Sequence, residues 1–206
     1  MYPYFKKTIH SSFKKTTPIF LNEIIELFPE YSRAYIFKEI KFAEMREDLV
    51  KFSPGVYYIP EQTRFGRSTI VAEMVINKKY IEDKNEIFGV YSGIKLLNMF
   101  LLTTQVPNIV ELTSNNETTR KRAIELDGMH FILKASRFQI TKENYQYYTI
   151  LELFTLIKPY EQIDDYALQQ INNYMDKTKV DKEQLLKLSV FFPNRTIKNM
   201  IRNGIL

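Results

Sequence analysis

The order of local patterns in the N-terminal part of the chain most constrains how it can fold. Apolar side chains recur at helical spacing in three successive segments, so we expect helices over 2–13, 19–28 and 32–46. Two β-rich runs follow, 48–52 and 56–59, and they flank a Pro-Gly turn that predicts a β-hairpin. The connection between the second and third helices is short enough for a helix-turn-helix.

Three helices followed by a hairpin are the element order of a winged helix-turn-helix domain. Residues 60–66 then break the pattern without the length or the low complexity of a flexible linker. We therefore place a domain boundary there, which gives an N-terminal domain over 1–60 and a second domain over 61–206. Of the 206 residues 45% are hydrophobic, which is enough to bury two modest cores.

The second domain mixes strand and helix patterns. Strands are expected over 87–91, 109–113, 123–126 and 129–133, and the last two flank Asp127-Gly128, a strong signal for a two-residue turn. Helices are expected over 69–80, 142–157, 165–176, 182–191 and 195–203, and a further helix follows Ser92. Ser92, Thr141 and Asp181 are the expected N-caps. The predicted fold class is α+β: a winged helix, then a small mixed sheet with a C-terminal helical layer.

The composition excludes cysteine chemistry, and together with the sequence pattern it favours a cytoplasmic location. Cysteine is absent, so the chain has no disulfide, no thiolate metal site and no thiol nucleophile. The sequence shows no signal-peptide pattern, and no segment reaches the roughly 18 apolar residues of a membrane span. We therefore expect a cytoplasmic protein without a membrane partner. The net charge of +5 is compatible with a polyanionic partner.

The common enzyme motifs are missing from the sequence. There is no Gly-rich phosphate loop ending in Lys-Ser or Lys-Thr, no Gly-x-Ser-x-Gly elbow, and no spaced aspartates of a nucleotidyl-transfer site. The two histidines, His10 and His130, lack metal-ligand spacing. Asp164 and Asp165 are interpreted as a helix cap rather than as an acid and a base. We expect no catalytic residue, no metal and no cofactor.

The third predicted helix carries the main candidate for a nucleic-acid surface. The candidate DNA-binding residues are Lys14, Lys15, Ser32, Arg33, Tyr35, Lys38, Lys41 and Lys51. Those on the third helix would enter the major groove, and the remaining lysines would meet the phosphate backbone. Glu39, Glu44 and Glu47 lie on the same helix and count against this interpretation, as does a hairpin turn without Arg or Lys.

A second basic run, Arg120-Lys121-Arg122, stands just before the predicted hairpin. It has two interpretations of equal weight. The run can touch phosphate groups or a second macromolecule, or it can be an ordinary solvated loop.

Several short motifs together resemble a known family. They are Gly55-Val56-Tyr57-Tyr58-Ile59-Pro60, Thr63-Arg64-Phe65-Gly66, Tyr91-Ser92-Gly93 with Asn98, Leu102-Thr103-Thr104-Gln105-Val106-Pro107, and Leu112-Thr113-Ser114-Asn115-Asn116. In order and spacing they resemble the AbiEi-like antitoxins of bacterial type IV toxin-antitoxin systems, which act in abortive infection. The resemblance covers roughly 17–157, and the segment ending in Thr-Gln-Val-Pro is its most specific part.

The resemblance implies a function in two parts. A winged helix would bind the promoter repeats of its own operon and repress transcription. The second domain would counter a nucleotidyltransferase-like toxin, without direct contact being required. The residues of the Thr-Gln-Val-Pro segment indicate no catalytic role, and we interpret the segment as structural, with Gln105 satisfying nearby backbone groups.

Two functional hypotheses therefore stand side by side. The first is a DNA-binding autorepressor and antitoxin that acts as a monomer or a weak dimer. The alternative is a protein-interaction module whose winged helix docks on a partner protein without specific DNA binding. An enzyme is the least expected class.

Overall fold

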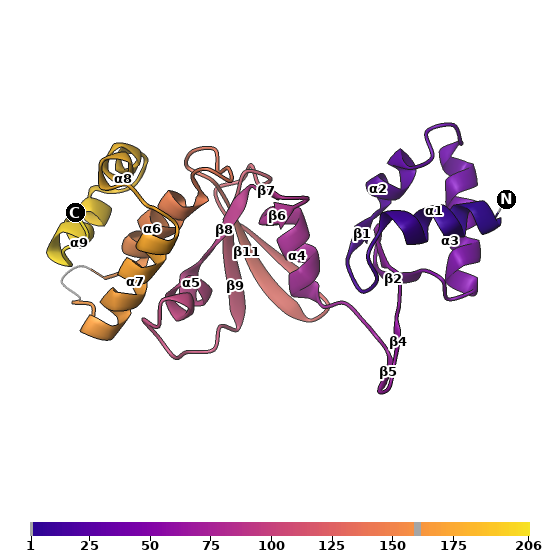
Figure 1. Cartoon of the computed structure of the whole chain (residues 1–206), viewed down its shortest axis with the longest axis horizontal. Coiled ribbons are helices and arrows are strands. Elements are labelled where there is room, and N and C mark those ends of the chain that lie inside the picture. The colour runs from indigo at the N-terminus through magenta and orange to yellow at the C-terminus, as the bar shows by residue number, and fades with distance from the viewer. Residues whose placement is uncertain (1, 159–161) are drawn as a thin grey trace. The chain divides into compact units, whose positions relative to one another are not determined.

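The computed structural model describes residues 2–158 and 162–206 (Figure 1). Over these residues the chain is an α+β protein with nine α-helices and several small sheets. The fold class predicted from the sequence is correct at this level. The chain divides into two compact units, Met1–Lys78 and Lys79–Leu206, which we call the N-terminal unit and the C-terminal unit.

The N-terminal unit begins with helices and continues with a small sheet. Its elements are α1 (Tyr2–Ser12), β1 (Ile19–Phe20), α2 (Leu21–Glu26), α3 (Arg33–Met45), β2 (Val50–Ser53), β3 (Val56–Tyr58), β4 (Gln62–Thr63), β5 (Gly66–Arg67) and most of α4 (Ala72–Tyr80). Strands β1, β3 and β2 form one antiparallel sheet in that order. The predicted hairpin is thus present as β2 and β3.

Ile19 and Phe20 differ from the prediction, which placed them in the second helix. They instead pair with Tyr57 and Val56 of β3, because their backbone groups complete the edge of the sheet. The N–H of Leu21 then donates to the carbonyl of Gly55, and the helix begins at Leu21. A two-residue strand at a helix start leaves no periodic signal in the sequence.

The core of the N-terminal unit lies among its helices and the sheet. Phe5 and Ile9 on α1 are four residues apart, so both point inward from one face of the helix. The ring of Phe5 stacks on Phe28 with centroids 4.9 Å apart. From α3 the buried side chains are those of Ile36, Ile40 and Ala43, as the spacing predicts.

Residues 61–78 belong to the N-terminal unit, whereas the sequence places the boundary at 60/61. The hydroxyl of Ser68 lies 2.8 Å from that of Thr16 and accepts the N–H of Glu61. The ammonium of Lys78 donates to the carbonyl of Pro18 and to the Glu23 carboxylate. These polar contacts join the segment after β3 to the first helices, and sequence patterns do not reveal them.

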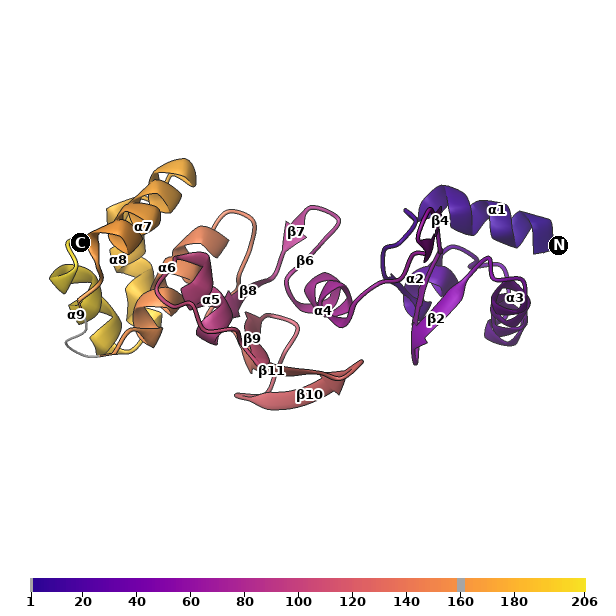
Figure 2. The same cartoon turned by 90° about the horizontal axis from the view of Figure 1, so that it is seen from below.

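The C-terminal unit contains a mixed sheet and a group of helices (Figures 1 and 2). Its elements are β6 (Glu82–Asp83), β7 (Glu86–Ile87), β8 (Gly89–Ser92), α5 (Gly93–Met99), β9 (Ile109–Ser114), β10 (Arg122–Leu126), β11 (Met129–Ala135), α6 (Tyr145–Leu156), α7 (Asp165–Lys177), α8 (Lys182–Leu188), the 3-10 helix η1 (Ser189–Phe191) and α9 (Asn194–Arg202). The four-stranded sheet has the order β10-β11-β9-β8. β9 and β11 are parallel, whereas the two outer pairs are antiparallel.

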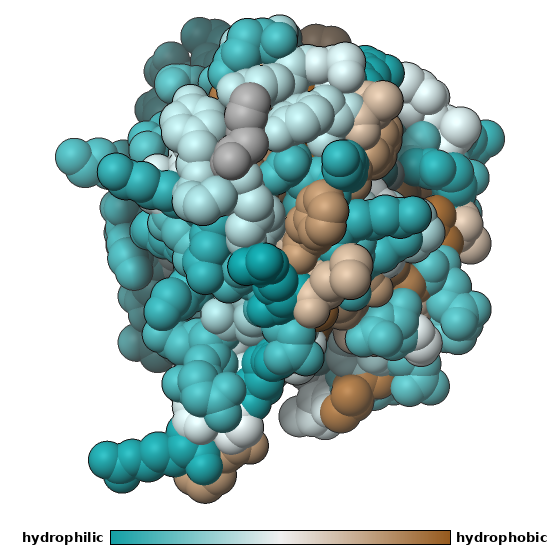
Figure 3. Space-filling view, turned by 90° about the vertical axis from the view of Figure 1, so that its right-hand side faces the viewer, coloured by the Kyte–Doolittle hydropathy of each residue, from teal (hydrophilic) through white to brown (hydrophobic). Residues whose placement is uncertain are grey.

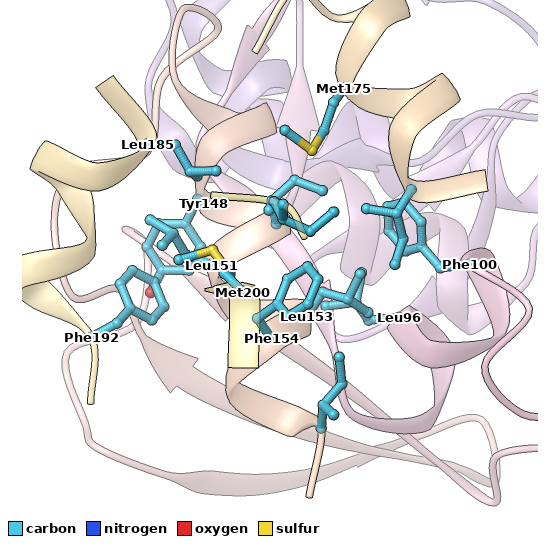
Figure 4. Packing of buried hydrophobic residues seen from close by; sticks show 14 of the residues in the cluster. Leu96, Phe100, Tyr148, Leu151, Leu153, Phe154, Met175, Leu185, Phe192 and Met200 are labelled. Atoms are coloured by element: carbon cyan, nitrogen blue, oxygen red, sulfur yellow. The ribbon is translucent and has the colours of Figure 1, made fainter. Parts of the chain in front are cut away.

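Helix α6 forms the centre of the C-terminal unit. Every residue from Tyr148 to Thr155 is buried, which is typical of a helix covered on all sides. It packs against β8 of the sheet and against α5, α8 and α9. Figure 4 shows Leu151, Leu153 and Phe154 of α6 among side chains from the other helices.

Two predicted helix caps of the C-terminal unit are wrong in detail. Ser92 stands at the N-cap position of α5, but its hydroxyl donates to the Glu152 carboxylate instead of accepting from the helix. Helix α6 begins at Tyr145, so Asn144 rather than Thr141 stands at its N-cap position, without a side-chain cap hydrogen bond. The caps at Asp164 and Asp181 are confirmed: their carboxylates accept the N–H groups of Ala167 and Gln184 at 2.8 Å.

Candidate nucleic-acid interface and basic hollow

Helix α3 presents a basic face to solvent. Ser32 is its N-cap, and its hydroxyl accepts a hydrogen bond from the N–H of Tyr35 at 3.3 Å. The exposed cationic residues of α3 and its C-cap are Arg33, Lys38, Lys41 and Arg46. Within the described residues none of the four forms an ion pair. Their charges are therefore available to an anionic partner.

Glu39 does not lie on that exposed face, although the sequence suggests that it weakens the positive charge there. Its side chain is buried, with 5% exposure. It is hydrogen-bonded to Tyr35, whose ring stacks on Tyr31. Desolvation, together with the hydrogen bond and the negative charge of Glu39, raises the pKa of Tyr35. Tyr35 is thus held half-buried rather than projecting fully from the helix.

The other two acidic residues near the end of α3 also offset less of the positive charge on its exposed face than the sequence suggests. Glu47 is paired with Arg67 of β5, and Glu44 is half-buried. The exposed face therefore carries more net positive charge than the sequence of the helix suggests.

Apolar side chains share the outer side of α3. Phe37, Phe42 and Met45 are 44%, 40% and 79% exposed. The ammonium of Lys38 lies 5.8 Å from the centroid of the Phe42 ring, a cation–π distance. Figure 3 looks onto the side where α3 lies in Figure 1 and shows hydrophobic groups among a mostly hydrophilic surface. This face can contact aliphatic and aromatic groups as well as anions.

The lysines predicted outside α3 are all exposed. Lys14 lies between α1 and β1, and Lys51 lies in β2 opposite Tyr57. The ammonium of Lys15 is 3.6 Å from the Glu61 carboxylate, which partly neutralises it. Lys14 and Lys51 have no carboxylate partner in the described part of the chain.

The hairpin β4–β5 adds basic residues that the sequence-based site does not include. Figure 1 shows it as a narrow hairpin that extends away from the helices of its own unit. Arg64 and Phe65 form its tip, and Phe65 is 102% exposed. The hydroxyl of Thr63 donates to the carbonyl of Gly66 and closes the turn. The only sequence signal for this element is the short Thr-Arg-Phe-Gly motif.

The three residues of the basic run at 120–122 do not share one role. The guanidinium of Arg122 donates to the Glu117 carboxylate at 2.9 Å and to the hydroxyl of Tyr80 at 3.0 Å. Burial opposes ionisation of Glu117, but its hydrogen bonds with Thr119, Arg122 and Thr118 lower its pKa to about 2. Arg122 therefore serves the structure of this loop, whereas its two neighbours do not share these bonds.

Arg120 and Lys121 border a hollow of about 750 Å³ in the C-terminal unit. Three more cations line it: Lys134 of β11, Arg137 after β11 and Arg195 of α9. The basic run in the sequence indicated Arg120 and Lys121, whereas the other three cations lie in separate segments and form no pattern with them.

Glu152 of α6 also lines the hollow. Glu152 is buried and accepts the hydroxyl of Ser92 at 2.5 Å. The ammonium of Lys134 lies 3.4 Å from the same hydroxyl oxygen and 2.6 Å from the Glu111 carboxylate. Lys134 is thus neutralised by Glu111, and its position is set by two polar neighbours.

The Thr-Gln-Val-Pro segment lies at the surface after α5. Thr104, Gln105 and Val106 are exposed. The side-chain amide of Asn98 donates to the carbonyl of Gln105 at 2.9 Å, and the N–H of Gln105 donates to the Thr103 hydroxyl. Asn98 and Thr103, rather than the side chain of Gln105, therefore supply these side-chain-to-backbone bonds.

Comparisons with known proteins do not assign the chain to a family. No protein-family model, curated protein or solved structure matches it. Among the described residues no helix has the length and apolar character needed to cross a membrane. The same residues contain no cluster of three His, Cys, Asp or Glu side chains suited to hold a metal ion.

Proposed function

We propose that the N-terminal unit is a winged helix-turn-helix domain that binds double-stranded DNA through α3. The observation that carries this proposal is the exposed face of α3, where Arg33, Lys38 and Lys41 have no ion-pair partner among the described residues while Glu39 is buried. Unpaired Arg and Lys on one helix face suit both phosphate contacts and base edges in the major groove.

The element order supports the same proposal. Helix α3 follows α2 after a short connection, and the antiparallel pair β2–β3 follows α3. In winged helices the second helix of the helix-turn-helix enters the major groove. On this proposal α3 is the helix that enters the groove.

The β4–β5 hairpin supports the proposal because it carries a basic residue that the β2–β3 turn lacks. The turn between β2 and β3 carries no Arg or Lys, whereas Arg64 stands at the exposed tip of β4–β5. We assign Arg64 to contact with the DNA backbone or the minor groove next to α3.

The regulatory role of the protein rests on its resemblance to AbiEi-like antitoxins. We propose that it represses its own promoter and counters a nucleotidyltransferase-like toxin encoded nearby. A gene of that class next to this one supports the proposal, and a neighbour of unrelated function counts against it.

The DNA-binding part of the proposal is tested by a gel-shift titration of the whole chain. The probes are its own upstream DNA and a scrambled duplex of the same length, each at two salt concentrations. We expect retardation of the upstream DNA at lower protein concentration than the scrambled duplex, weakened at higher salt because bound phosphates release counterions. Equal and weak retardation of both duplexes contradicts sequence-specific binding.

A protein-docking role is the second candidate, and a specific observation favours it. Phe37, Phe42 and Met45 expose apolar surface on the same side of α3 as the cations. Aromatic residues and Met are enriched in protein interfaces. A stable complex with the product of the neighbouring gene at physiological salt, lost on Phe42→Ser with Met45→Ser, supports docking. Retention of that complex in the variant contradicts it.

A further inference from the structure

The hollow of the C-terminal unit has an unusual balance of charge. Arg120, Lys121, Arg137 and Arg195 line it, and within the described residues none of these four has an ion-pair partner. The fifth cation, Lys134, is neutralised by Glu111. Among the described residues that line the hollow, Glu152 is the one acidic side chain. Against this one carboxylate, the four cations without an ion-pair partner among the described residues leave a net positive charge around one concave surface, which favours an anionic ligand.

The cations reach the hollow from parts of the chain that are far apart in sequence. Arg120 and Lys121 precede β10, whereas Arg195 lies in the first turn of α9. Arg137 follows β11, and its guanidinium lies 5.1 Å from the centroid of the Phe192 ring. The backbone N–H of Arg137 donates to the hydroxyl of Tyr148 at 3.0 Å. These contacts hold Arg137 at the wall, so this side chain is partly preorganised.

The size of the hollow matches a small ligand. Its volume of about 750 Å³ lies within the roughly 300–1,000 Å³ of small-molecule and cofactor sites. Arginine and lysine are the side chains that bind phosphate groups, arginine by paired N–H donors and lysine as a point charge. A compact, phosphate-bearing molecule satisfies both the volume and the charge.

Glu152 gives the hollow a second kind of recognition. Its carboxylate is buried and already accepts one hydroxyl, that of Ser92. An ionised carboxylate has acceptor capacity for further donors. It would repel phosphate but accept hydrogen bonds from the hydroxyl groups of a sugar or the N–H groups of a base. The four cations that have no ion-pair partner in the described part of the chain, together with this acceptor, therefore suit the two ends of a nucleotide.

We propose that this hollow binds a free nucleoside polyphosphate. Arg120, Lys121 and Arg195 hold the phosphate groups, and Glu152 accepts hydrogen bonds from the nucleoside. This site is separate from the exposed face of α3 and does not depend on DNA binding by that helix.

Isothermal titration of the whole chain with adenosine triphosphate, guanosine triphosphate and inorganic triphosphate tests the proposal. The test variants are Arg120→Gln with Lys121→Gln, and Arg195→Gln alone. The matched control is Lys142→Gln with Lys182→Gln, two exposed lysines of the same unit that do not line the hollow. The control removes as much positive charge as the double test variant.

We expect one nucleotide to bind per chain, and each test variant to weaken binding about tenfold or more, because each loses charge-assisted hydrogen bonds. The control should bind like the parent chain. A circular-dichroism melt of every variant without ligand establishes that it is folded.

Three results would overturn the proposal. One is the absence of binding by either nucleotide to the folded parent chain at low salt. Another is equal weakening in the control, which would make the binding a property of net charge. The third is binding of a short single-stranded DNA at this hollow without binding of free nucleotide, which would assign the cations to a nucleic-acid strand.

Discussion

Glu117 is the centre of a small polar network in the loop before β10. Its carboxylate accepts the N–H groups of Thr118 and Thr119, the hydroxyl of Thr119 and the guanidinium of Arg122. These bonds are formed to an ionised group that is 6% exposed. Loss of a charged partner in such a network leaves several donors unsatisfied.

The charge of Glu117 should make part of the stability depend on pH. Its pKa is lowered from 4.5 to about 2 in the folded chain, so its contribution is complete above about pH 4.5 and is lost as pH falls towards 2. We expect Glu117→Gln to lower the free energy of unfolding by about 2 kcal/mol at neutral pH. Urea denaturation at pH 7 and pH 3 should show this difference shrinking at the lower pH. A difference that is the same at both pH values contradicts this role.

Gly89 is required by close approach of the backbone. A Cβ atom at this position would lie 1.9 Å from the carbonyl oxygen of Tyr80 and 2.9 Å from that of Thr113. Gly89→Ala must therefore displace β8 or the end of α4. We expect a loss of about 3 kcal/mol in the free energy of unfolding, measured by urea denaturation. Gly128→Ala is the comparison: its Cβ meets no atom within 4 Å, but its φ of +73° adds backbone strain of about 1–2 kcal/mol without a steric clash. A loss at Gly89 no larger than at Gly128 contradicts the steric argument.

At the scale of elements, long periodic segments were predictable and short ones were not. The spacing of Phe5 and Ile9 in α1, and of Ile36, Ile40 and Ala43 in α3, corresponds to buried helix faces. Strand β1 was missed because its two residues are ordered by pairing with β3. The same holds for β4–β5 and β6–β7, whose strands have two residues each.

The β4–β5 hairpin offers a prediction that belongs to this scale. Arg64 is exposed at the tip and has no ion-pair partner in the described residues. If it contacts a phosphate, Arg64→Ala should weaken binding to upstream DNA and reduce the salt slope by about 1. The melting temperature should not change. Fluorescence anisotropy at several salt concentrations measures both affinity and slope, and an unchanged slope removes Arg64 from the interface.

At the scale of the whole molecule, two hydrophobic clusters are defined among the described residues. One is formed in the N-terminal unit around residues such as Phe5 and Ile40, and the other in the C-terminal unit around α6. The composition predicts two cores, but the position of the division depends on hydrogen bonds of Ser68 and Lys78 that no sequence pattern reports. Hydrophobic periodicity does not predict polar contacts between residues that are far apart in the sequence.

A core substitution should therefore destabilise the unit that contains it and leave the other unit unchanged. Leu153→Ala removes a side chain with 0% exposure in α6 and should cost about 3 kcal/mol. Hydrogen exchange should show faster exchange in the sheet and helices of the C-terminal unit, with protection in α1 and α3 unchanged. Equal loss of protection in both units contradicts this division of the chain.

The candidate sites were predictable to different degrees. The basic face of α3 follows from helical spacing, so Arg33, Lys38 and Lys41 were identified from the sequence. The burial of Glu39 was not predictable from the sequence, because glutamate side chains are mostly exposed in folded proteins. Of the cations that line the basic hollow, the sequence indicated only Arg120 and Lys121. Arg137 and Arg195 come next to them only in the folded chain.

The measurement that tests the central claim most directly is the salt dependence of binding to upstream DNA by the parent chain and by Arg33→Ala with Lys38→Ala. Lys142→Ala with Lys182→Ala is the matched control, since it removes the same charge from exposed positions of the C-terminal unit. We predict at least about tenfold weaker binding and a salt slope shallower by about 2 in the α3 variant, with the control like the parent. An α3 variant that binds with the affinity and slope of the parent would contradict the assignment of α3 as the DNA-binding helix.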